Sequence, residues 1–547
     1  MKKKLLSLVL AGVMCLSVCA CGKEAREESQ EVVTPTVSTQ TSESQEAEEY
    51  VPTYPIVDEK ITVTGLVVGK DTSVSSTRLV WDLVEEVTNI HVEWENIDKE
   101  AYATRLASGD WPDIIAQKMD QTLVNDLGVV GGKFVNYLDY LDIMPNLKKT
   151  FEDYPLVLAC ATQINGEVYN LFRVSGAAST SVMARPHYRV DVLEKAGITE
   201  PPTTTEEFYD CLVTLKDYYG VPSYIHNTNM QSDYNPILFP AFGTLTQMDF
   251  ADDGTGKLVF ARTTEQMKLY YQFMHKLYEE ELMNREYVTL DKAAQLSLAQ
   301  SGQVAFITQD SANKLTEEDL GGNFENLGTL APFTSEYDDT MEIMGYLDYY
   351  DTHGMYINAE SEYIEEICKM LDIAFATEEV VEGSNLYGVN FSQGPEHDTW
   401  VHNGDGTYTE FTPEGFKSKS VYMNQVYGWD SFGRRDEIAG LVTSNVSNSW
   451  ARQKGYVANI LPYQSDIIVR DTALKFTEDE QYVIDNKYGE IKAYYNQMEA
   501  EFITGVSDID AKWDEYVATL EKMGAAEVLE VYQMAYDRFQ TALNALK

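Results

Sequence analysis

Strand and helix patterns alternate where the folded part of the chain begins, and this alternation constrains the fold more than any other feature. Runs rich in Val, Ile and Thr, typical of strands, are separated by runs whose apolar residues recur on one helical face. The elements predicted in order are a strand over 61–68, a helix over 79–87, a strand over 89–94, a helix over 98–107 and a strand at 114–115. This order predicts a doubly wound α/β sheet.

The same patterns continue downstream. Residues 203–207 read Thr-Thr-Thr-Glu-Glu after two prolines, which is a helix start signal, and apolar residues then follow one helical face up to Tyr219. A further amphipathic helix is predicted over 265–282 and a buried strand over 302–307. Residues 478–547 contain no proline and predict a helical C-terminal region. There is no internal repeat.

The first residues have the pattern of an export signal. Three lysines follow Met1, residues 5–16 are almost entirely apolar, and small residues lead to Val18-Cys19-Ala20-Cys21. The apolar run is too short for an ordinary membrane-spanning helix. Residues 1–20 are therefore predicted to be a signal peptide, and an uncleaved N-terminal anchor is the alternative. The final four residues resemble a bacterial lipobox, which implies cleavage before Cys21 and acylation of its thiol.

Residues 21–55 are predicted to be a disordered acidic tether. From Lys23 to Pro55 there are eight glutamates and no Leu, Ile, Phe or Trp, so this segment cannot bury a core. A flexible chain of this length spans about 30 Å. No later apolar run is long enough to cross a bilayer, so the lipid would be the membrane anchor.

Charge and cysteine content exclude several classes of protein. The 547 residues include 41 Lys and Arg against 88 Asp and Glu, a net charge of −47, which disfavours nucleic-acid binding. Without the signal and the acylated cysteine, Cys160, Cys211 and Cys368 remain, and they predict neither a disulfide framework nor a zinc site. No serine-hydrolase, zinc-protease or nucleotide-binding motif is present, so an enzyme is not expected, although paired carboxylates leave a glycosidase or lyase open.

Several short motifs occur in an order that resembles one family. They are the lipobox, the acidic tether, residues 107–114 (ASGDWPDI), 189–197 (RVDVLEKAG), 202–208 (PTTTEEF) and 302–305 (GQVA). Together they resemble an extracellular solute-binding lipoprotein of an ABC importer, of the class that takes up oligosaccharides. The resemblance implies two α/β lobes joined by crossing strands, a ligand between them, and a membrane permease as partner. It also implies a monomer on the outer face of the cell membrane.

From the resemblance, lobe 1 is expected over 56–180 and 350–395, and lobe 2 over 181–349 and 396–547. The crossings are expected near 180–187, 345–356 and 395–420. Relatives often carry a calcium loop after the helix that follows Glu207, but residues 216–222 lack its Asp and Asn ligands. Neither a metal nor a cofactor is therefore expected.

Aromatic and charged residues in loops are the candidates for ligand contact. Sugars present hydroxyl groups to polar side chains and flat C–H faces to aromatic rings. Each candidate has a structural alternative as a helix cap, a buried core residue or part of a packed loop. The candidates are Asp110, Trp111, Trp400, Tyr427, Trp429, Asp430 and Arg434. Asp110 and Trp111 are expected at the carboxyl edge of the first sheet, where open α/β sheets bind ligands.

The acidic surface gives no means of attracting polyanions, so neutral oligosaccharides are expected ahead of uronates or peptides. A single arginine in the cleft would reverse this preference. A sensor or adhesin that uses the same fold without transport is an alternative that the sequence leaves open.

Overall fold

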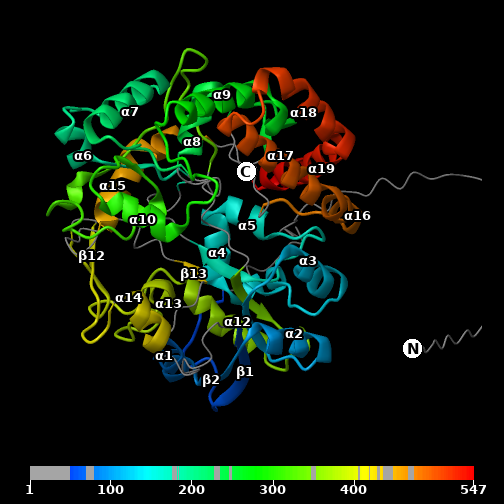
Figure 1. Cartoon of the computed structure of the whole chain (residues 1–547). Helices are drawn as coiled ribbons and strands as arrows, with labels where there is room; N and C mark the ends of the chain where they lie inside the picture. Colours follow the sequence, from blue (N-terminus) through cyan, green and yellow to red (C-terminus); the bar gives the residue numbers. More distant parts are fainter. Residues whose placement is uncertain are drawn as a thin grey trace, which may run out of the picture. The chain divides into compact units, whose positions relative to one another are not determined.

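A computed structural model describes residues 50–68, 79–174, 182, 184–226, 234–244, 249–345, 353–404, 407–417, 419–427, 432–434, 448–465 and 473–546 (Figure 1). The signal, Cys21 and most of the expected tether lie outside these residues. The tether was expected to run to residue 55, but Tyr54 already packs against the hydrophobic core. Within the described ranges we find no helix whose length and hydropathy would let it span a membrane.

A six-stranded sheet organises lobe 1. Its order is β13-β4-β10-β3-β1-β2, with β10 antiparallel to both of its neighbours and the other pairs parallel. The strands are β1 (Ile61–Val68), β2 (Ile90–Ile97), β3 (Ile114–Lys118), β4 (Leu171–Val174), β10 (His353–Ile357) and β13 (Gly433–Arg434). The carboxyl ends of five strands and the amino end of β10 therefore share one edge, which we call the carboxyl edge.

Alternating side chains explain why both faces of this sheet are covered. Val63 and Ile114 face the main hydrophobic core, which includes buried residues of α1, whereas Leu66 and Ile115 face a second cluster that contains Tyr102 of α2. The first helices of the lobe are α1 (Leu79–Thr88), α2 (Lys99–Ser108), α3 (Gln121–Val124), α4 (Pro145–Asp153) and α5 (Pro155–Ala161), with a π-helical turn at Asn125–Val130 and a 3₁₀ segment at Tyr137–Ile143. The predicted alternation of strands and helices is confirmed.

Gly65 of β1 is required by close packing. It lies opposite Trp94 of β2 in the strand register, and a Cβ atom at this position would stand 2.5 Å from the Trp94 ring. Any larger residue would displace this ring, which packs 5.0 Å from Trp81 between ring centroids. The glycine therefore allows α1 to dock on the strands.

Lobe 2 contains a three-stranded sheet in the order β8-β5-β9, with both pairs antiparallel. Its strands are β5 (His187–Arg189), β8 (Phe306–Ile307) and β9 (Leu327–Thr329), and α15 (Ser449–Asn459) packs on β9. The other helices are α6 (Val190–Lys195), α7 (Thr205–Tyr219), α8 (Asn235–Leu238), α10 (Lys292–Gln300) and α11 (Gln309–Ala312), with 3₁₀ turns at Pro240–Phe242, Phe324–Asn326 and Leu461–Tyr463.

The helix start predicted at residues 203–207 is confirmed. The Thr204 side chain accepts a hydrogen bond from the Glu207 backbone N–H and caps α7. The Glu207 carboxylate in turn accepts one from the Thr203 backbone N–H. The hydrogen bonds that the carboxylate accepts from Thr203 lower the pKa of Glu207, since they favour its ionised form.

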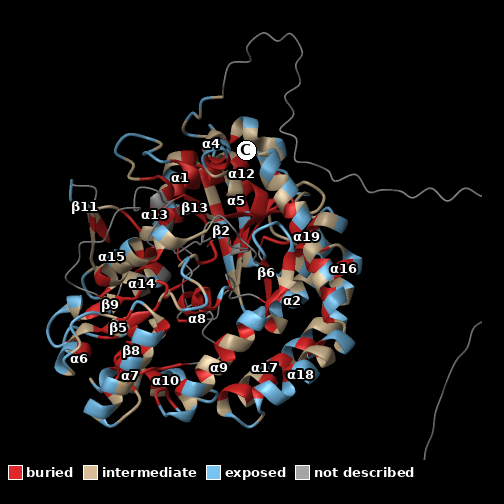
Figure 2. Cartoon of the chain, turned by 90° about the horizontal axis from the view of Figure 1, so that it is seen from above, coloured by how far each residue is buried: buried red, intermediate tan, exposed pale blue. Residues whose placement is uncertain are grey.

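The helical C-terminal region is confirmed. It comprises α16 (Glu478–Val483), a π-helical turn at Ile484–Tyr488, α17 (Gly489–Thr504), α18 (Ile509–Met523) and α19 (Ala525–Ala545). These helices pack on α9 (Glu265–Glu279) and on the hairpin of β6 (Phe250–Asp252) and β7 (Leu258–Phe260), which precedes a 3₁₀ turn at Ala261–Thr263. α19 also contacts α5 of lobe 1. Buried residues lie on the strands and on the inner sides of the helices (Figure 2).

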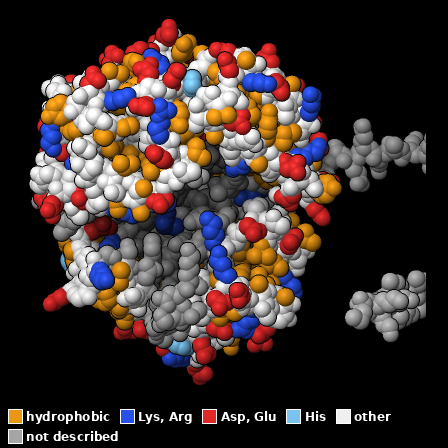
Figure 3. Space-filling view, viewed as in Figure 1, with side chains coloured by type: hydrophobic (Ala, Val, Ile, Leu, Met, Phe, Trp, Pro, Cys, Tyr) orange, Lys and Arg blue, Asp and Glu red, His pale blue; other side chains and the backbone are white. Residues whose placement is uncertain are grey.

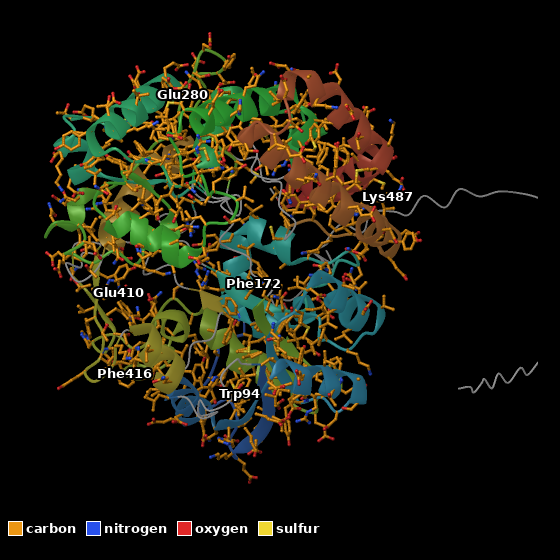
Figure 4. The ribbon with its side chains drawn as sticks, in the orientation of Figure 1. Trp94, Phe172, Glu280, Glu410, Phe416 and Lys487 are labelled. Atoms are coloured by element: carbon orange, nitrogen blue, oxygen red, sulfur yellow. The ribbon has the colours of Figure 1, made fainter. Side chains whose placement is uncertain are left out.

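The expected lobe boundary at 395 is wrong. After α12 (Ile364–Asp372), a 3₁₀ turn (Ile373–Phe375) and α13 (Gly388–Gln393), the hairpin of β11 (Trp400–His402) and β12 (Tyr408–Glu410) packs against Ala376 and Tyr387 of lobe 1. The chain then passes through α14 (Lys419–Tyr422) and a π-helical turn (Met423–Tyr427) into β13, which pairs with β4. Lobe 1 therefore extends to Arg434. Figure 4 shows Glu410 and Phe416 of this excursion on the side of the molecule opposite Lys487.

The chain accordingly passes between the sheets in three places. It leaves the six-stranded sheet after Val174 and enters the three-stranded sheet at His187, then returns between Thr329 and His353. The third passage follows Arg434 and ends at α15. The expected third crossing at 395–420 is thus replaced by a passage after 434, because the hairpin is a local excursion of lobe 1.

Cys160, Cys211 and Cys368 are all buried, as the sequence predicts. Burial raises the pKa of the Cys211 thiol to about 12. The Cys211 thiol is therefore a packing group, since a thiol held in its neutral form is a poor nucleophile.

Asp372 should make the stability of lobe 1 depend on pH. Its buried carboxyl group accepts hydrogen bonds from the backbone N–H groups of Asn146 and Leu147, at 3.2 and 2.8 Å, at the start of α4. Burial nevertheless raises its pKa to about 7, and these hydrogen bonds only partly oppose that shift.

Because the folded pKa lies above the unfolded one, the contribution of Asp372 is complete below about pH 4 and is lost as pH rises towards 7. Asp372→Asn should remove this dependence, so the free energy of unfolding of the wild type should fall relative to the variant by several kcal/mol between about pH 4 and pH 7. Urea titrations at several pH values measure the difference. A constant difference would contradict the assignment.

Candidate functional site

The candidate ligand site lies between the two sheet edges at which the chain leaves one lobe and enters the other. In lobe 1 this is the carboxyl edge, with Lys118, Val174 and Arg434 at strand ends. In lobe 2 it is the edge where β5 begins at His187 and where β8 and β9 end, since both run antiparallel to β5. Figure 3 shows the molecular surface hollowed between the two lobes, with Lys and Arg side chains at the margin of the hollow.

Asp110 and Trp111 lie at the opposite end of the first sheet. They precede β3, so they are at its amino end, because the strand begins only after Pro112. Asp110 is exposed and forms an ion pair of 2.5 Å with Arg105. Trp111 is half-buried, and its ring centroid lies 5.7 Å from that of Phe134. The expectation that these residues occupy the carboxyl edge is wrong.

Trp400 and Tyr427 are core residues in this structure. Trp400 is completely buried, and its Nε1–H donates to the carbonyl oxygen of Gly394 at 2.9 Å. Tyr427 is also buried and stacks on Tyr422, with a centroid distance of 6.4 Å. Burial raises the pKa of its hydroxyl. Neither ring offers a surface for a sugar here.

Arg434 lies at the carboxyl edge of the six-stranded sheet. It ends β13, is buried, and forms a 2.8 Å ion pair with Asp153 while its guanidinium lies 5.2 Å from the centroid of the Tyr154 ring. Hydrogen bonds from Lys149 and then Arg434 lower the pKa of Asp153. Trp429 and Asp430 lie outside the described residues.

A polar cluster at the start of β5 was not anticipated from the sequence. The Nε2 atom of His187 lies 2.8 Å from the Tyr456 hydroxyl, and its Nδ1 lies 3.3 Å from the carbonyl oxygen of Gly328. These partners are consistent with a neutral ring that donates through Nδ1 and accepts at Nε2. Asn459 also donates to the Thr329 carbonyl oxygen at 2.7 Å. The cluster fixes α15 to the edge where the first and third passages enter lobe 2.

Little in the amino-acid sequence indicates this cluster. His187 is an isolated histidine and Tyr456 lies within an ordinary amphipathic helix, so only the fold brings them together. The end of β3 could have been predicted from the sequence, because Gln117, Lys118 and Met119 directly follow the apolar run of that strand.

No group of three or more His, Cys, Asp and Glu side chains is arranged to hold a metal ion among the residues that the structure describes. The candidate site therefore offers arginines, amides and hydroxyl groups, which are suited to binding polar ligands through hydrogen bonds.

Comparison with known protein families shows to which family the chain belongs. Residues 71–381 match the bacterial extracellular solute-binding proteins. The chain belongs to this family. The match starts after the expected tether and includes all three strands of the second sheet.

Individual members of the solute-binding family resemble the chain over most of its length. The substrate-binding protein FusA of a fructooligosaccharide ABC transporter from Streptococcus pneumoniae is 24% identical over 489 residues, which are 85% of this chain and 88% of FusA. Its structure in complex with kestose has a TM-score of 0.66 at 19% identity and covers 88% of this chain and 100% of that one.

An HMO-binding solute-binding protein associated with an ABC transporter, from Bifidobacterium longum infantis, has a TM-score of 0.71 at 18% identity. It covers 88% of this chain and 99% of that structure. At these identities the structural matches establish the fold, which confirms the two-lobed solute-binding architecture expected from the sequence motifs.

Proposed function

We propose that this protein captures an oligosaccharide between its lobes and delivers it to the membrane permease of an ABC importer. The single observation that carries the proposal is the family match over residues 71–381. The names of the relatives support the ligand class, since FusA serves a fructooligosaccharide transporter and the Bifidobacterium protein is described as binding HMO.

The geometry suits binding by lobe closure. Two sheet edges with polar and charged side chains are connected by three passages, which can act as hinges. Closing the lobes on a sugar excludes water and strengthens each hydrogen bond to its hydroxyl groups. The closed form then depends on ligand, and a permease can distinguish it from the open form. No chemical step is part of this function.

The remaining assignments follow from the sequence. Acylation of Cys21 would hold the protein at the outer face of the membrane, with the acidic segment after it as a spacer. The proposed partners are the oligosaccharide and the permease subunits, and the protein is proposed to act as a monomer. Arg434, Trp429 and Asp430 are retained as proposed ligand contacts, because Arg434 ends a strand at the carboxyl edge and the other two lie close before that strand.

Trp429→Ala tests the proposed contact. If the indole stacks on a sugar ring, its loss should weaken oligosaccharide binding about tenfold to hundredfold, equivalent to about 1.4–2.8 kcal/mol. Isothermal titration calorimetry on residues 50–547, with an oligosaccharide selected by a thermal-shift screen, measures the effect. Trp111→Ala is the matched control, because Trp111 lies at the amino end of β3. Equal losses in the two variants would contradict the assignment of Trp429.

A further inference from the structure

A buried polar cluster lies at the lobe 2 edge of the candidate site, on the side of β8 away from β5. Tyr224 forms parallel bridges with Phe306 of β8 and with Met283, which adds two short segments to the three-stranded sheet. Because both segments run parallel to β8, the residues that follow the bridges lie at the edge where β8 ends. These residues are His226 and Asn284.

Tyr234 connects the cluster to the start of β5. Its hydroxyl group donates a hydrogen bond to the carbonyl oxygen of His187 and lies 3.2 Å from that of Ile307. Its ring centroid is 5.0 Å from that of Tyr224, whose hydroxyl oxygen lies 3.1 Å from Nδ1 of His226. Direct contacts therefore lead from His187 at the candidate site to His226.

Two buried polar groups beside His226 have no hydrogen-bond partner. The Oδ1 atom of Asn284 accepts a hydrogen bond from the His226 backbone N–H at 2.8 Å, and the Tyr287 ring centroid lies 5.5 Å from that of the His226 ring. Within the part of the chain that the structure describes, Asn284 Nδ2 and the Tyr287 hydroxyl are both unpaired, although both residues are more than nine-tenths buried. Burying a polar group without a partner is costly, so two such groups beside one imidazole indicate a bound polar group.

The three side chains of this cluster are uncharged. Burial alone lowers the pKa of His226 to about 4, so at physiological pH its ring is neutral and has one N–H and one acceptor nitrogen. Burial, followed by the charge of Glu499, raises the pKa of the Tyr287 hydroxyl, which stays protonated. An ion bound here would lack a counter-charge from these side chains, so they suit a neutral group that both donates and accepts.

We propose that Asn284, Tyr287 and His226 bind one neutral hydroxyl oxygen at the lobe 2 edge of the candidate site. Such an oxygen can accept a hydrogen bond from Asn284 Nδ2 and exchange hydrogen bonds with the Tyr287 hydroxyl and the imidazole. The oxygen belongs to the captured oligosaccharide, a source that rests on the proposed function, or to an ordered water molecule. Both sources make the same hydrogen bonds, and the experiment separates them.

Tyr287→Phe tests the proposal, because it removes the hydroxyl group and keeps the ring. If ordered water occupies the site, the variant loses a hydrogen bond, and the melting temperature of the ligand-free protein should fall by about 1–3 °C. A crystal structure of the ligand-free wild type should then show an ordered oxygen within hydrogen-bond distance of Asn284 Nδ2 and the Tyr287 hydroxyl.

If the sugar supplies the oxygen, Tyr287→Phe removes a group that is unpaired in the ligand-free protein, and the melting temperature should rise. Titration calorimetry with two neutral trisaccharides, kestose and maltotriose, should then show binding to the variant that is about three- to tenfold weaker than to the wild type. Tyr218→Phe is the matched control, because Tyr218 is an exposed lobe 2 tyrosine, and it should change neither measurement.

An unchanged or raised melting temperature of Tyr287→Phe, together with unchanged affinity for both trisaccharides, overturns the inference while the proposed function stands. If neither trisaccharide binds the wild type, that result counts against the proposed function, and the melting temperature alone decides the inference. A fall then supports a water-filled site, and a rise or no change overturns it.

Discussion

Replacing Arg262 by alanine should destabilise the protein by about 3–5 kcal/mol, because the substitution leaves the buried carboxylate of Asp249 and the half-buried one of Glu499 without their cationic partner. Arg262 is buried, and its Nε donates to Asp249 at 2.9 Å while Nη1 donates to Glu499 of α17 at 2.8 Å. Its guanidinium also lies 4.8 Å from the centroid of the Tyr495 ring. The residue thus ties the β6–β7 hairpin and the turn after it to the C-terminal helices.

The lowered pKa of Asp249 shows that its neighbours compensate the charge of this buried carboxylate. Burial opposes the charged form, yet the pKa of Asp249 is lowered because Arg262, Tyr488 and Tyr495 compensate the carboxylate. The Tyr495 hydroxyl donates to Asp249 at 2.5 Å. Removing the arginine would leave this carboxylate and that of Glu499 in an apolar setting, and the C-terminal helices should loosen first.

Urea denaturation of the Arg262→Ala protein measures the free energy of unfolding, and hydrogen exchange locates the change. The matched control is Arg285→Ala, since Arg285 is exposed and its solvent-screened pair with Glu281 should contribute little to stability. A loss below 1 kcal/mol for Arg262→Ala, or faster exchange spread evenly over both lobes, would show that the network does not anchor the helices.

Trp400→Ala is expected to have an effect of similar size in lobe 1, about 3–5 kcal/mol. The indole fills the small core formed by Ala376, Tyr387 and Tyr408, and its N–H satisfies the carbonyl oxygen of Gly394. Alanine leaves a cavity and removes the shorter of two hydrogen bonds to the Gly394 carbonyl oxygen, which keeps only a 3.4 Å bond from Asn390. Trp400→Phe keeps most of the packing and should cost less, because it removes the hydrogen bond but leaves an aromatic ring.

The same variants decide between the two interpretations of Trp400. If the residue is structural, the folded fraction of Trp400→Phe should bind oligosaccharide within about twofold of the wild type. A tenfold or greater loss of affinity in a stable Trp400→Phe protein would instead support the sequence-based hypothesis that this tryptophan contacts the ligand. Calorimetry together with thermal unfolding separates the two effects.

The architecture could be predicted because it depends on local patterns. Periodicity alone located the strands near Ile61 and Ile114, and the capping threonine at 204 marked the start of α7. The lobe boundary at 395 could not be predicted, because β13 consists of two residues whose pairing with β4 is non-local. A strand of two residues is too short to produce a recognisable apolar pattern in the sequence.

Individual site residues were harder to predict for a different reason. An isolated tryptophan or tyrosine has the same sequence signature whether its ring is buried, as in Trp400, or faces a ligand. Trp111 was misplaced because the loop after α2 leads into the amino end of β3, whereas ligands of open α/β sheets bind at the carboxyl ends of strands. Arg434 was expected in a loop but ends strand β13, whereas His187 and Tyr456 become neighbours only through the packing of α15 on β9.

The most direct test of the central claim is to titrate residues 50–547 with an oligosaccharide that the protein binds. Small-angle X-ray scattering then measures the shape of the protein, and mass spectrometry of the recovered glycan shows whether it is intact. The account predicts saturable binding of one glycan per protein, a smaller radius of gyration in the bound state, and recovery of the glycan intact. Cleavage of the glycan, or binding that leaves the scattering curve unchanged, would contradict capture by lobe closure.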